Sequence, residues 1–261
     1  MRSMEIAATG MLAQEMNVEV ISNNIANVNT TAFKRSRVEF QDLLYQDLRT
    51  VGANSSEQGT IVPTGAQIGV GVQAAAVYRM NDQGSLTETS NSLDLAIQGR
   101  GYFQVQIPGG QTAYTRDGSF QLSPTGEMVT ADGFVVMPGI TLPSNTVSVT
   151  VNQNGQVLAQ VAGQAAQTTV GQFELATFPN EAGLANIGSN LLQQTAASGA
   201  PVTGIPGNTD FGTMQQGFLE TSNVNVVTEM TNLITAQRAY EMNSKVVQVS
   251  DQMSATLNNF R

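Results

Sequence analysis

Residues 11–28, MLAQEMNVEVISNNIANV, decide how this chain begins, because their apolar side chains recur at helical spacing. Steps of mostly three and four residues connect Met4, Ala8, Met11, Val18, Ile21, Ile25 and Val28. This spacing is typical of a heptad seam on a helix and not of a strand. Asn and Thr side chains compete with the backbone for hydrogen bonds, so we expect the helix to end near Asn27–Thr31.

The far end of the chain repeats this pattern, with no Gly or Pro from Val226 to Arg261. Its apolar series comprises Met230, Leu233, Tyr240, Val246, Val249, Met253, Leu257 and Phe260. We expect a second helix there, with Asn223 or Asn225 as its N-cap and Glu229 near the positive end of its dipole.

Both apolar stripes are narrow, so each helix alone would leave a seam exposed. Two interpretations stay open. The helices cover each other or the rest of the subunit, or they complete their packing against other subunits and fold as they assemble.

Between the helical ends, short strand patterns alternate with tight turns such as Pro108-Gly109-Gly110 and Asn154-Gly155. The strands predicted from these patterns are 93–97, 102–107, 112–115, 127–130, 134–137, 147–151, 156–161 and 170–178. Strands joined by such short turns predict an antiparallel sandwich or barrel without βαβ units. Residues 196–217 are rich in Gly and Pro and are expected to form a return loop.

The predicted fold class is therefore α+β. The terminal helices pair as a coiled-coil-like inner domain, and an antiparallel β-rich domain with an extended arm is inserted between them. We place the N-terminal helix at 1–30, a connecting segment at 31–80 with the arm at about 46–63, the β-rich domain and return loop at 81–221, and the C-terminal helix at 222–261.

The composition excludes several classes of function. The net charge of −9 repels phosphate backbones, so a nucleic-acid partner is not expected. Lys34, Arg35 and Arg37 form the one basic cluster and are interpreted as a solvated corner. With no Cys and no His, the chain lacks the commonest metal ligands and the commonest general base. We predict no catalytic, cofactor-binding or metal-binding residues.

Two other functions would require features that the sequence lacks or would not need features that it has. A hydrolase would need a pair of carboxylates, for which Asp117 and Glu127 are the candidates. However, Arg116-Asp117-Gly118 is typical of a hairpin turn with a local ion pair. A monomeric β-sandwich binding module would not need helical ends with exposed seams.

The N-terminal residues contain no secretory h-region, and no run of 18 apolar residues predicts a transmembrane segment. These features indicate a protein that is cytoplasmic or exported without a cleaved signal.

Residues 22–30, SNNIANVNT, are rich in Asn. They form either a solvated helix terminus or a set of amides that bridge neighbouring helices and fix their register.

Four blocks of sequence resemble the rod and hook proteins of the bacterial flagellum, the axial protein family. The blocks are 22–35 (SNNIANVNTTAFKR), 95–103 (LAIQGRGYF), 114–120 (YTRDGSF), and 217–225 (GFLETSNVN) with 237–241 (QRAYE). Residues 42–46 followed by 52–58 resemble an insertion of the distal-rod branch of this family. The alternative is another axial subunit, from the proximal rod or the hook.

The resemblance implies a subunit that polymerises into a hollow helical drive shaft and transmits motor torque to the hook. The residues expected to pack between subunits are Met11, Val18, Ile21, Asn24, Ile25, Asn27, Val28, Met230, Leu233, Tyr240, Val246, Met253 and Leu257. A stiffening arm is expected to wedge between neighbouring subunits, with Tyr45, Ser55, Ser56, Glu57, Gln58 and Pro63.

The resemblance also implies partners and a location. The partners are further copies of the chain, the proximal rod proteins, the hook protein, the surrounding P- and L-ring proteins, and the flagellar type III export apparatus. The location is the basal body, in a rod that spans the periplasm.

Overall fold

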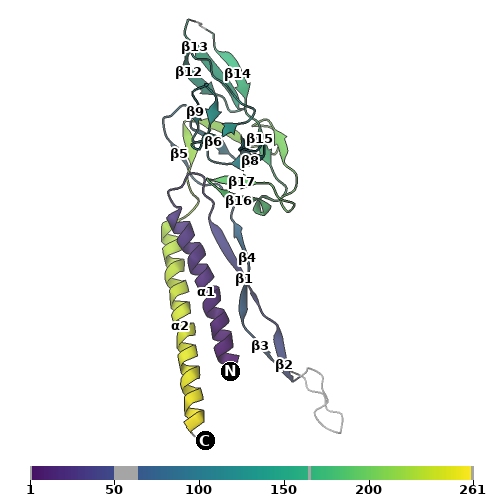
Figure 1. The fold of residues 1–261 in the computed structure, drawn as a ribbon, viewed down its shortest axis with the longest axis vertical. Helices are drawn as coiled ribbons and strands as arrows, with labels where there is room; N and C mark the ends of the chain where they lie inside the picture. Colours follow the sequence, from purple (N-terminus) through teal and green to yellow (C-terminus); the bar gives the residue numbers. More distant parts are fainter. Residues whose placement is uncertain (1, 50–63, 164–165, 260–261) are drawn as a thin grey trace. The chain divides into compact units, whose positions relative to one another are not determined.

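The computed structural model describes residues 2–49, 64–163 and 166–259, the last three by their backbone alone. The chain forms two compact units, and each is described by itself. Unit 1 contains Met1–Ala26, Ser36–Arg79 and Asn225–Arg261, and unit 2 contains Asn27–Arg35 and Met80–Val224. The predicted α+β class is confirmed, with helices at both ends and antiparallel strands between them (Figure 1).

Unit 1 is built on two long helices that run antiparallel and side by side (Figure 1). Helix α1 spans Arg2–Ala26, and helix α2 spans Val226–Asn259. Asn225 is the N-cap of α2, because its side-chain Oδ1 accepts a hydrogen bond of 3.1 Å from the backbone N–H of Thr228.

Four strands complete unit 1 as two antiparallel ribbons. Strand β1 (Ser36–Asp42) pairs with β4 (Val72–Arg79), and β2 (Tyr45–Arg49) pairs with β3 (Ala66–Gly69). The first ribbon packs on α1, where the hydroxyl of Thr9 accepts a hydrogen bond of 3.3 Å from the backbone N–H of Val72. Helix α1 is therefore covered by α2 on one side and by this ribbon on another.

Unit 2 contains the remaining strands and a short 3₁₀ helix, η1 (Glu181–Gly183). Its strands are β5 (Leu86–Glu88), β6 (Leu95–Gln98), β7 (Tyr102–Gln106), β8 (Thr112–Thr115), β9 (Gln121–Leu122), β10 (Met128–Val129), β11 (Val135–Val136), β12 (Thr146–Val151), β13 (Gln156–Val161), β14 (Thr168–Gln172), β15 (Leu175–Thr177), β16 (Ala185–Gly188), β17 (Leu191–Gln193), β18 (Val202–Gly204), β19 (Thr213–Gln216) and β20 (Phe218–Glu220).

The strands of unit 2 form one large antiparallel sheet and three small ones. The large sheet has the order β16-β17-β8-β7-β11-β10-β9, and β15 joins β7 to β18. A second sheet has the order β12-β13-β14, and two further pairs are β19 with β6 and β20 with β5. The last two pairs bring the chain that precedes α2 back onto strands near the start of the β region.

The core of unit 2 lies around three phenylalanines. Phe103 meets Phe120 edge to face, with ring centroids 5.0 Å apart, and Phe173 stacks on Phe120 at 6.3 Å. Leu95, Ile97 and other fully buried side chains surround them. Such aromatic pairs add about 0.5–1.5 kcal/mol each beyond the burial of their area.

The structure departs from the sequence-based expectation in several places, and strands β1, β2, β5, β9 and β20 are among those that were not predicted. Residues 196–217 contain β18 and β19 and so are more than a return loop. The predicted strand at 170–178 is two strands, because Phe173 leaves the ladder to fill the core. Strands β16 and β17 were not predicted. In addition, the expected connecting segment, 31–80, is divided between the two units.

Candidate assembly surface

The contact between α1 and α2 is regular along its length. Ser3 and Ser250 share a hydrogen bond of 2.8 Å between their hydroxyls, and Asn24 Nδ2 donates to Glu229 Oε2 at 3.4 Å. Between these levels, Gly10 lies so close to Asn243 that a Cβ on the glycine would be 2.7 Å from its Nδ2. In each pair the residue numbers add to 253, so the helices stay in one register.

Small and polar side chains dominate the α2 side of this contact. Among the side chains of α2 that the structure describes, Glu229, Ala236 and Ser250 are buried, and Asn243 and Val247 are half-buried on the same stripe. Their spacings of three, four and seven place them on one stripe that faces α1. Small residues allow two helices to approach closely, but they leave the large apolar side chains of α2 on its other faces.

Asn24 fixes the end of α1 within unit 1. Its Oδ1 accepts a hydrogen bond of 2.8 Å from the backbone N–H of Ser36, and its Nδ2 donates one of 2.9 Å to the Ser36 carbonyl. The side chain is 2% exposed. Asn24, expected to pack between subunits, thus holds the first residue of β1 in its own chain.

The residues predicted to pack between subunits fall into three groups. Ile21 and Asn24 are buried inside unit 1. Half-buried positions are Met11, Val18, Ile25 and Leu233 in unit 1, and Asn27 and Val28 in unit 2. Exposed positions are Met230, Tyr240, Val246 and Met253, all on α2. The side chain of Leu257 lies outside the described residues.

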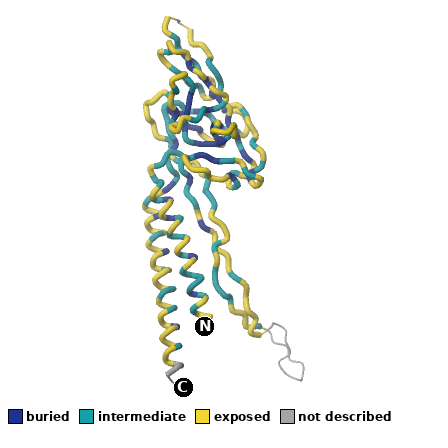
Figure 2. The backbone as a smooth tube through the Cα atoms, viewed as in Figure 1, coloured by how far each residue is buried: buried dark blue, intermediate teal, exposed yellow. Residues whose placement is uncertain are grey.

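Sequence reasoning missed the most exposed apolar side chains of the helices. Val227 is 75% exposed, Leu12 66% and Met242 62%, and Ile234 is also half exposed. Exposed residues recur along both helices (Figure 2). The signal was present in the sequence, since these residues lie between the positions of the predicted seams and give each helix apolar side chains on more than one face.

A hollow of about 230 Å³ lies on α2 beside Ser3 of α1. Lys245, Val246, Val249, Ser250 and Met253 form the rest of its wall. The wall is mainly apolar, with one ammonium group at its side. A hollow of this kind suits an apolar side chain that has a carboxylate nearby.

The ribbon of β2 and β3 exposes both of its faces. All five residues of β2 are exposed, and Leu44, just before it, is 86% exposed. Tyr45 and Ile68 add further exposed apolar area. An isolated two-stranded ribbon is at best marginally stable in water, so this one is suited to a partner. The other predicted arm residues, Ser55, Ser56, Glu57, Gln58 and Pro63, lie outside the described residues.

Unit 2 contains a buried group of three charges. Glu220 Oε2 accepts a hydrogen bond of 2.8 Å from Arg116 Nε, and Oε1 forms an ion pair with Lys34. The backbone N–H of Gly84 also donates to Oε1, at 2.9 Å, and Lys34 donates to the carbonyl of Asp82 at 2.8 Å. The triad therefore joins the segment that follows α1, the strand that precedes α2, and the β core.

Two expectations from the sequence are corrected by this triad. Lys34 is 7% exposed and is not part of a solvated corner. Arg116 does not pair with the adjacent Asp117 but with Glu220, and it also donates to the carbonyls of Ile97, Gly99 and Gly101. Arg116 can replace water with four acceptors, which is why a guanidinium is tolerated at this depth.

Burial and charge oppose each other at Glu220. Burial alone would raise the pKa of its carboxyl, but the nearby Arg116 and Lys34 and the hydrogen bonds from Lys34 and Gly84 outweigh it and hold the pKa below its ordinary value. Burial lowers the pKa of Lys34 by more than the charge of Glu220 raises it. The carboxylate is thus the charge that keeps the two cations in place.

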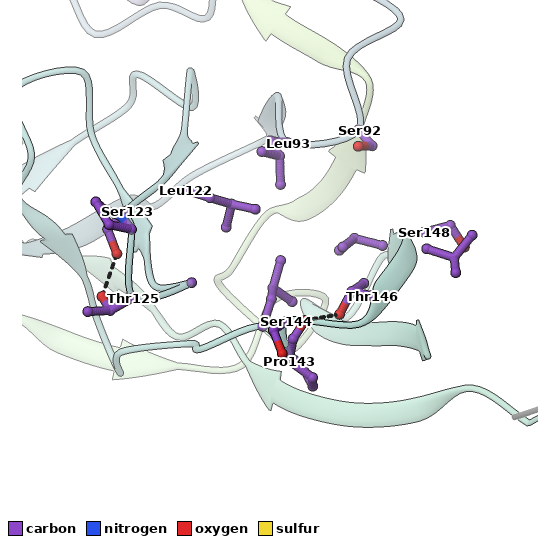
Figure 3. Close-up of a pocket in the computed structure, with 14 residues that line it drawn as sticks. Ser92, Leu93, Leu122, Ser123, Thr125, Pro143, Ser144, Thr146 and Ser148 are labelled. Carbon is purple, nitrogen blue, oxygen red and sulfur yellow. Dashed lines mark hydrogen bonds between the residues drawn. The ribbon is translucent and has the colours of Figure 1, made fainter. Parts of the chain in front are cut away.

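A second hollow, in unit 2, is the candidate for small-molecule chemistry (Figure 3). Its walls carry hydroxyls, among them Ser123 and Thr125, whose oxygens are 2.7 Å apart, and Thr146, which donates to the carbonyl of Pro143. No ionisable side chain is among the described residues that line it. The hollow therefore offers neither a general acid nor a general base.

Two further properties concern the described residues as a whole. They contain no cluster of three or more Asp and Glu side chains with the geometry to hold a metal ion. None of the helices in the described ranges has the length and hydropathy needed to span a membrane.

Comparison with known proteins gives three family matches along the chain. Residues 4–34 match the flagella basal body rod protein family, residues 96–159 match the D1 domain of the flagellar hook protein FlgE/F/G, and residues 215–260 match the C-terminal part of the flagellar basal body rod FlgEFG proteins. The matches cover most of α1 and α2 and the centre of unit 2.

Similar proteins cover the full length. The flagellar basal-body rod protein FlgG of Caulobacter vibrioides is 54% identical over 97% of both chains. The protein of the same name from Borreliella burgdorferi is 44% identical over 100% of this chain and 99% of its own. The flagellar hook-basal body complex protein FlhP of Bacillus subtilis is 31% identical over 100% of both.

Proposed function

Since this chain belongs to the flagellar rod and hook protein family, we propose that it is a structural subunit of the flagellar rod, in its distal segment. Copies polymerise through their terminal helices into a hollow helical shaft. The shaft transmits motor torque to the hook, and its lumen passes later subunits outward. The identity of 54% to a flagellar basal-body rod protein, over 97% of both chains, supports a position in the rod.

The observation that carries this proposal is the apolar surface that unit 1 leaves uncovered on its helices. Leu12, Val227, Ile234, Met242 and Val249 are all at least half exposed. Burial of one such side chain contributes about 1.5–3 kcal/mol. Burial of these side chains together opposes an association cost of about 4–15 kcal/mol, and contact between copies is a direct way to cover them.

The proposal also includes a role for the arm in stiffening the shaft. We propose that the arm, residues 46–63, wedges between neighbouring copies together with the ribbon of β2 and β3, and restricts their sliding. The support is the exposed apolar side chains of this ribbon, Leu44, Tyr45, Leu48 and Ile68. Deletion of residues 46–63 is expected to shorten the persistence length of the polymers in electron micrographs. Polymers of unchanged straightness would refute the wedge.

The partners and location proposed for the chain follow from its family. Proximal rod proteins and the hook protein adjoin the two ends of the shaft, and the P- and L-ring proteins surround it in the periplasm. Delivery is by the flagellar type III export apparatus, as the family implies.

Sedimentation velocity over a concentration series tests the proposed assembly. The full chain is compared with a fragment of residues 27–224, and circular dichroism is measured on both. The full chain is expected to form large species as its concentration rises, while the fragment stays small and β-rich. A full chain that remains a monomer at every concentration, with its full helix content, would favour a monomeric binding module instead.

A further inference from the structure

The outer faces of the two helices carry opposite charge. On α1, the side turned away from α2 presents Glu5, Leu12, Glu15, Met16 and Glu19, all exposed; we call it the acidic face. On α2, the side turned away from α1 presents Ile234, Arg238 and Lys245, with Met242 and Val249 at its edge, all exposed; we call it the basic face.

Helix geometry fixes which way these side chains point. Nine residues of an α-helix correspond to two and a half turns, so residues nine apart lie on opposite sides. Leu12, Glu15 and Glu19 are each nine residues from Ser3, Asn24 and Gly10, the three positions of α1 in contact with α2.

The same spacing holds on α2. Arg238 is nine residues from Glu229, Ile234 is nine from Asn243, and Lys245 is nine from the buried Ala236.

These charges cannot satisfy one another within a chain. Glu15 and Arg238 lie at the same level of the helix pair, because their numbers also add to 253, but they point in opposite directions with both helices between them. Within the described part of the chain, Glu15, Glu19, Arg238 and Lys245 take part in no ion pair. A carboxylate and a guanidinium arranged in this way can meet only across two copies.

We propose that the acidic face of α1 on one copy docks on the basic face of α2 on the next. This inference rests on the proposed function and names the contact through which the copies join. Both faces combine charge with exposed apolar side chains at seam spacing, as intermolecular coiled-coil contacts do. Opposite charges give the contact its orientation and suppress docking of like faces.

Two further observations support a second copy of the chain as the partner that docks on the basic face. The hollow of about 230 Å³ adjoins the basic face, since Lys245 and Val249 belong to both. An apolar side chain of the acidic face, such as Leu12, is followed three residues later by Glu15 and so brings a carboxylate with it.

The contact is also heterologous, since it uses a different face on each copy, and it leaves a free face at both ends. A chain of copies can therefore grow without closing.

The charge balance of the basic face includes one opposing group. Glu241 is exposed between Arg238 and Lys245, four residues before the lysine, a spacing at which the carboxylate supports the ammonium group along the same helix. Arg2 and Asp251 lie near the helix ends, outside both faces as defined. The acidic face contains no basic residue and three acidic ones.

Charge reversal and mixing test the inference on the full chain. Variant A carries Glu15→Lys and Glu19→Lys, and variant B carries Arg238→Glu and Lys245→Glu. The control carries Asp132→Lys and Glu174→Lys, two exposed acids of unit 2, and so has the same change in net charge as variant A. Circular dichroism checks that each variant keeps its helices, and sedimentation velocity at about 50 mM salt measures assembly.

Variants A and B alone are each expected to need at least about tenfold more protein than the wild type to form large species, because like charges then face each other. Their equimolar mixture is expected to assemble near the wild-type concentration, since the lysines of A meet the glutamates of B. The control assembles as the wild type does.

Three results would overturn the inference while leaving the proposed function intact. They are wild-type assembly by A and B alone, a mixture that assembles no better than its components, and a control as impaired as A. Failure of the wild type itself to assemble would instead count against the proposed function and, with it, this contact.

Discussion

At the scale of single residues, Glu220 is the point on which unit 2 depends. Its carboxylate holds two buried cations, Lys34 and Arg116, that are 186 and 104 residues away in sequence. A buried group of charges adds little net free energy of folding while all three charges are paired, because desolvation offsets their attraction. Removal of one member is costly, because the remaining charges are left without partners in a dry environment.

Glu220→Gln is therefore expected to lower the free energy of unfolding by about 3–5 kcal/mol, measured by urea denaturation at pH 7. Arg100→Gln is the matched control. It removes an ion pair in which Arg100 is exposed and Glu181 is half-buried, and it is expected to cost less than about 1 kcal/mol. Equal effects from the two substitutions would show that burial of the triad is unimportant.

The same carboxyl predicts how stability depends on pH. The pKa of Glu220 is lower in the folded chain than in the unfolded one, so the unfolded state binds more protons between the two values. The stabilisation is complete above the ordinary pKa of about 4.5 and is lost as the pH falls through the depressed value. Urea titrations from pH 7 to pH 3 should show the gap between wild type and Glu220→Gln narrowing below about pH 4.5; a constant gap would contradict this assignment.

Asn24 is the corresponding residue of unit 1. Asn24→Ala removes both hydrogen bonds to Ser36 and leaves Glu229 without one of its donors. Each buried polar group left unpaired costs about 1–3 kcal/mol, so the unfolding free energy should fall by at least about 2 kcal/mol. Asn29→Ala, at an exposed position, is the control and should change it by less than about 0.5 kcal/mol.

At the scale of elements, the close approach of α1 and α2 depends on Gly10. A larger side chain there would push directly into Asn243, whose Nδ2 is 2.7 Å from the position of a Cβ. Gly10→Leu is therefore expected to separate the helices and to destabilise them by about 1–3 kcal/mol, seen as earlier thermal loss of the circular dichroism signal at 222 nm. Ser22→Leu places the same side chain on an exposed site of α1 and should leave this transition unchanged.

How well the elements could be predicted depended on how local their signals are. The helices follow from apolar spacing that any short window contains, and the Asn-rich stretch after Ala26 marks where α1 ends. Strands β16 and β17 gave no such signal, since all four residues of β16 are exposed and β17 has three residues. Strand β17 pairs with β8 and β16 pairs with β17, and no local sequence pattern reveals these pairings.

The candidate surface was predictable only in part, for the same reason. The sequence identified apolar seams on both helices but could not tell which stripe faces the partner helix. The structure assigns the small and polar stripe of α2, with Ala236 and Ser250, to that contact. Arg116 shows the limit clearly: its neighbour Asp117 was a plausible partner, whereas the true one, Glu220, is close only in three dimensions.

At the scale of the whole molecule, each terminal helix makes two contacts in the proposed assembly. One joins α1 to α2 within unit 1, and the other joins opposite outer faces of successive copies. The first uses small and polar residues, and the second uses apolar and charged ones. This division explains why large side chains such as Leu12 and Met242 stay exposed in the single chain.

Cysteine cross-linking tests this central claim most directly, because the chain contains no cysteine of its own. Ser22→Cys lies on the outer side of α1 and Thr231→Cys on that of α2, both exposed. After treatment of assembled protein with a flexible thiol cross-linker, the double variant should give a ladder of oligomers on a denaturing gel. Mixed single variants should give nothing larger than dimers, and each single variant alone should stay monomeric. Dimers from a single variant, or no ladder from the double one, would contradict head-to-tail contact between the outer faces of α1 and α2.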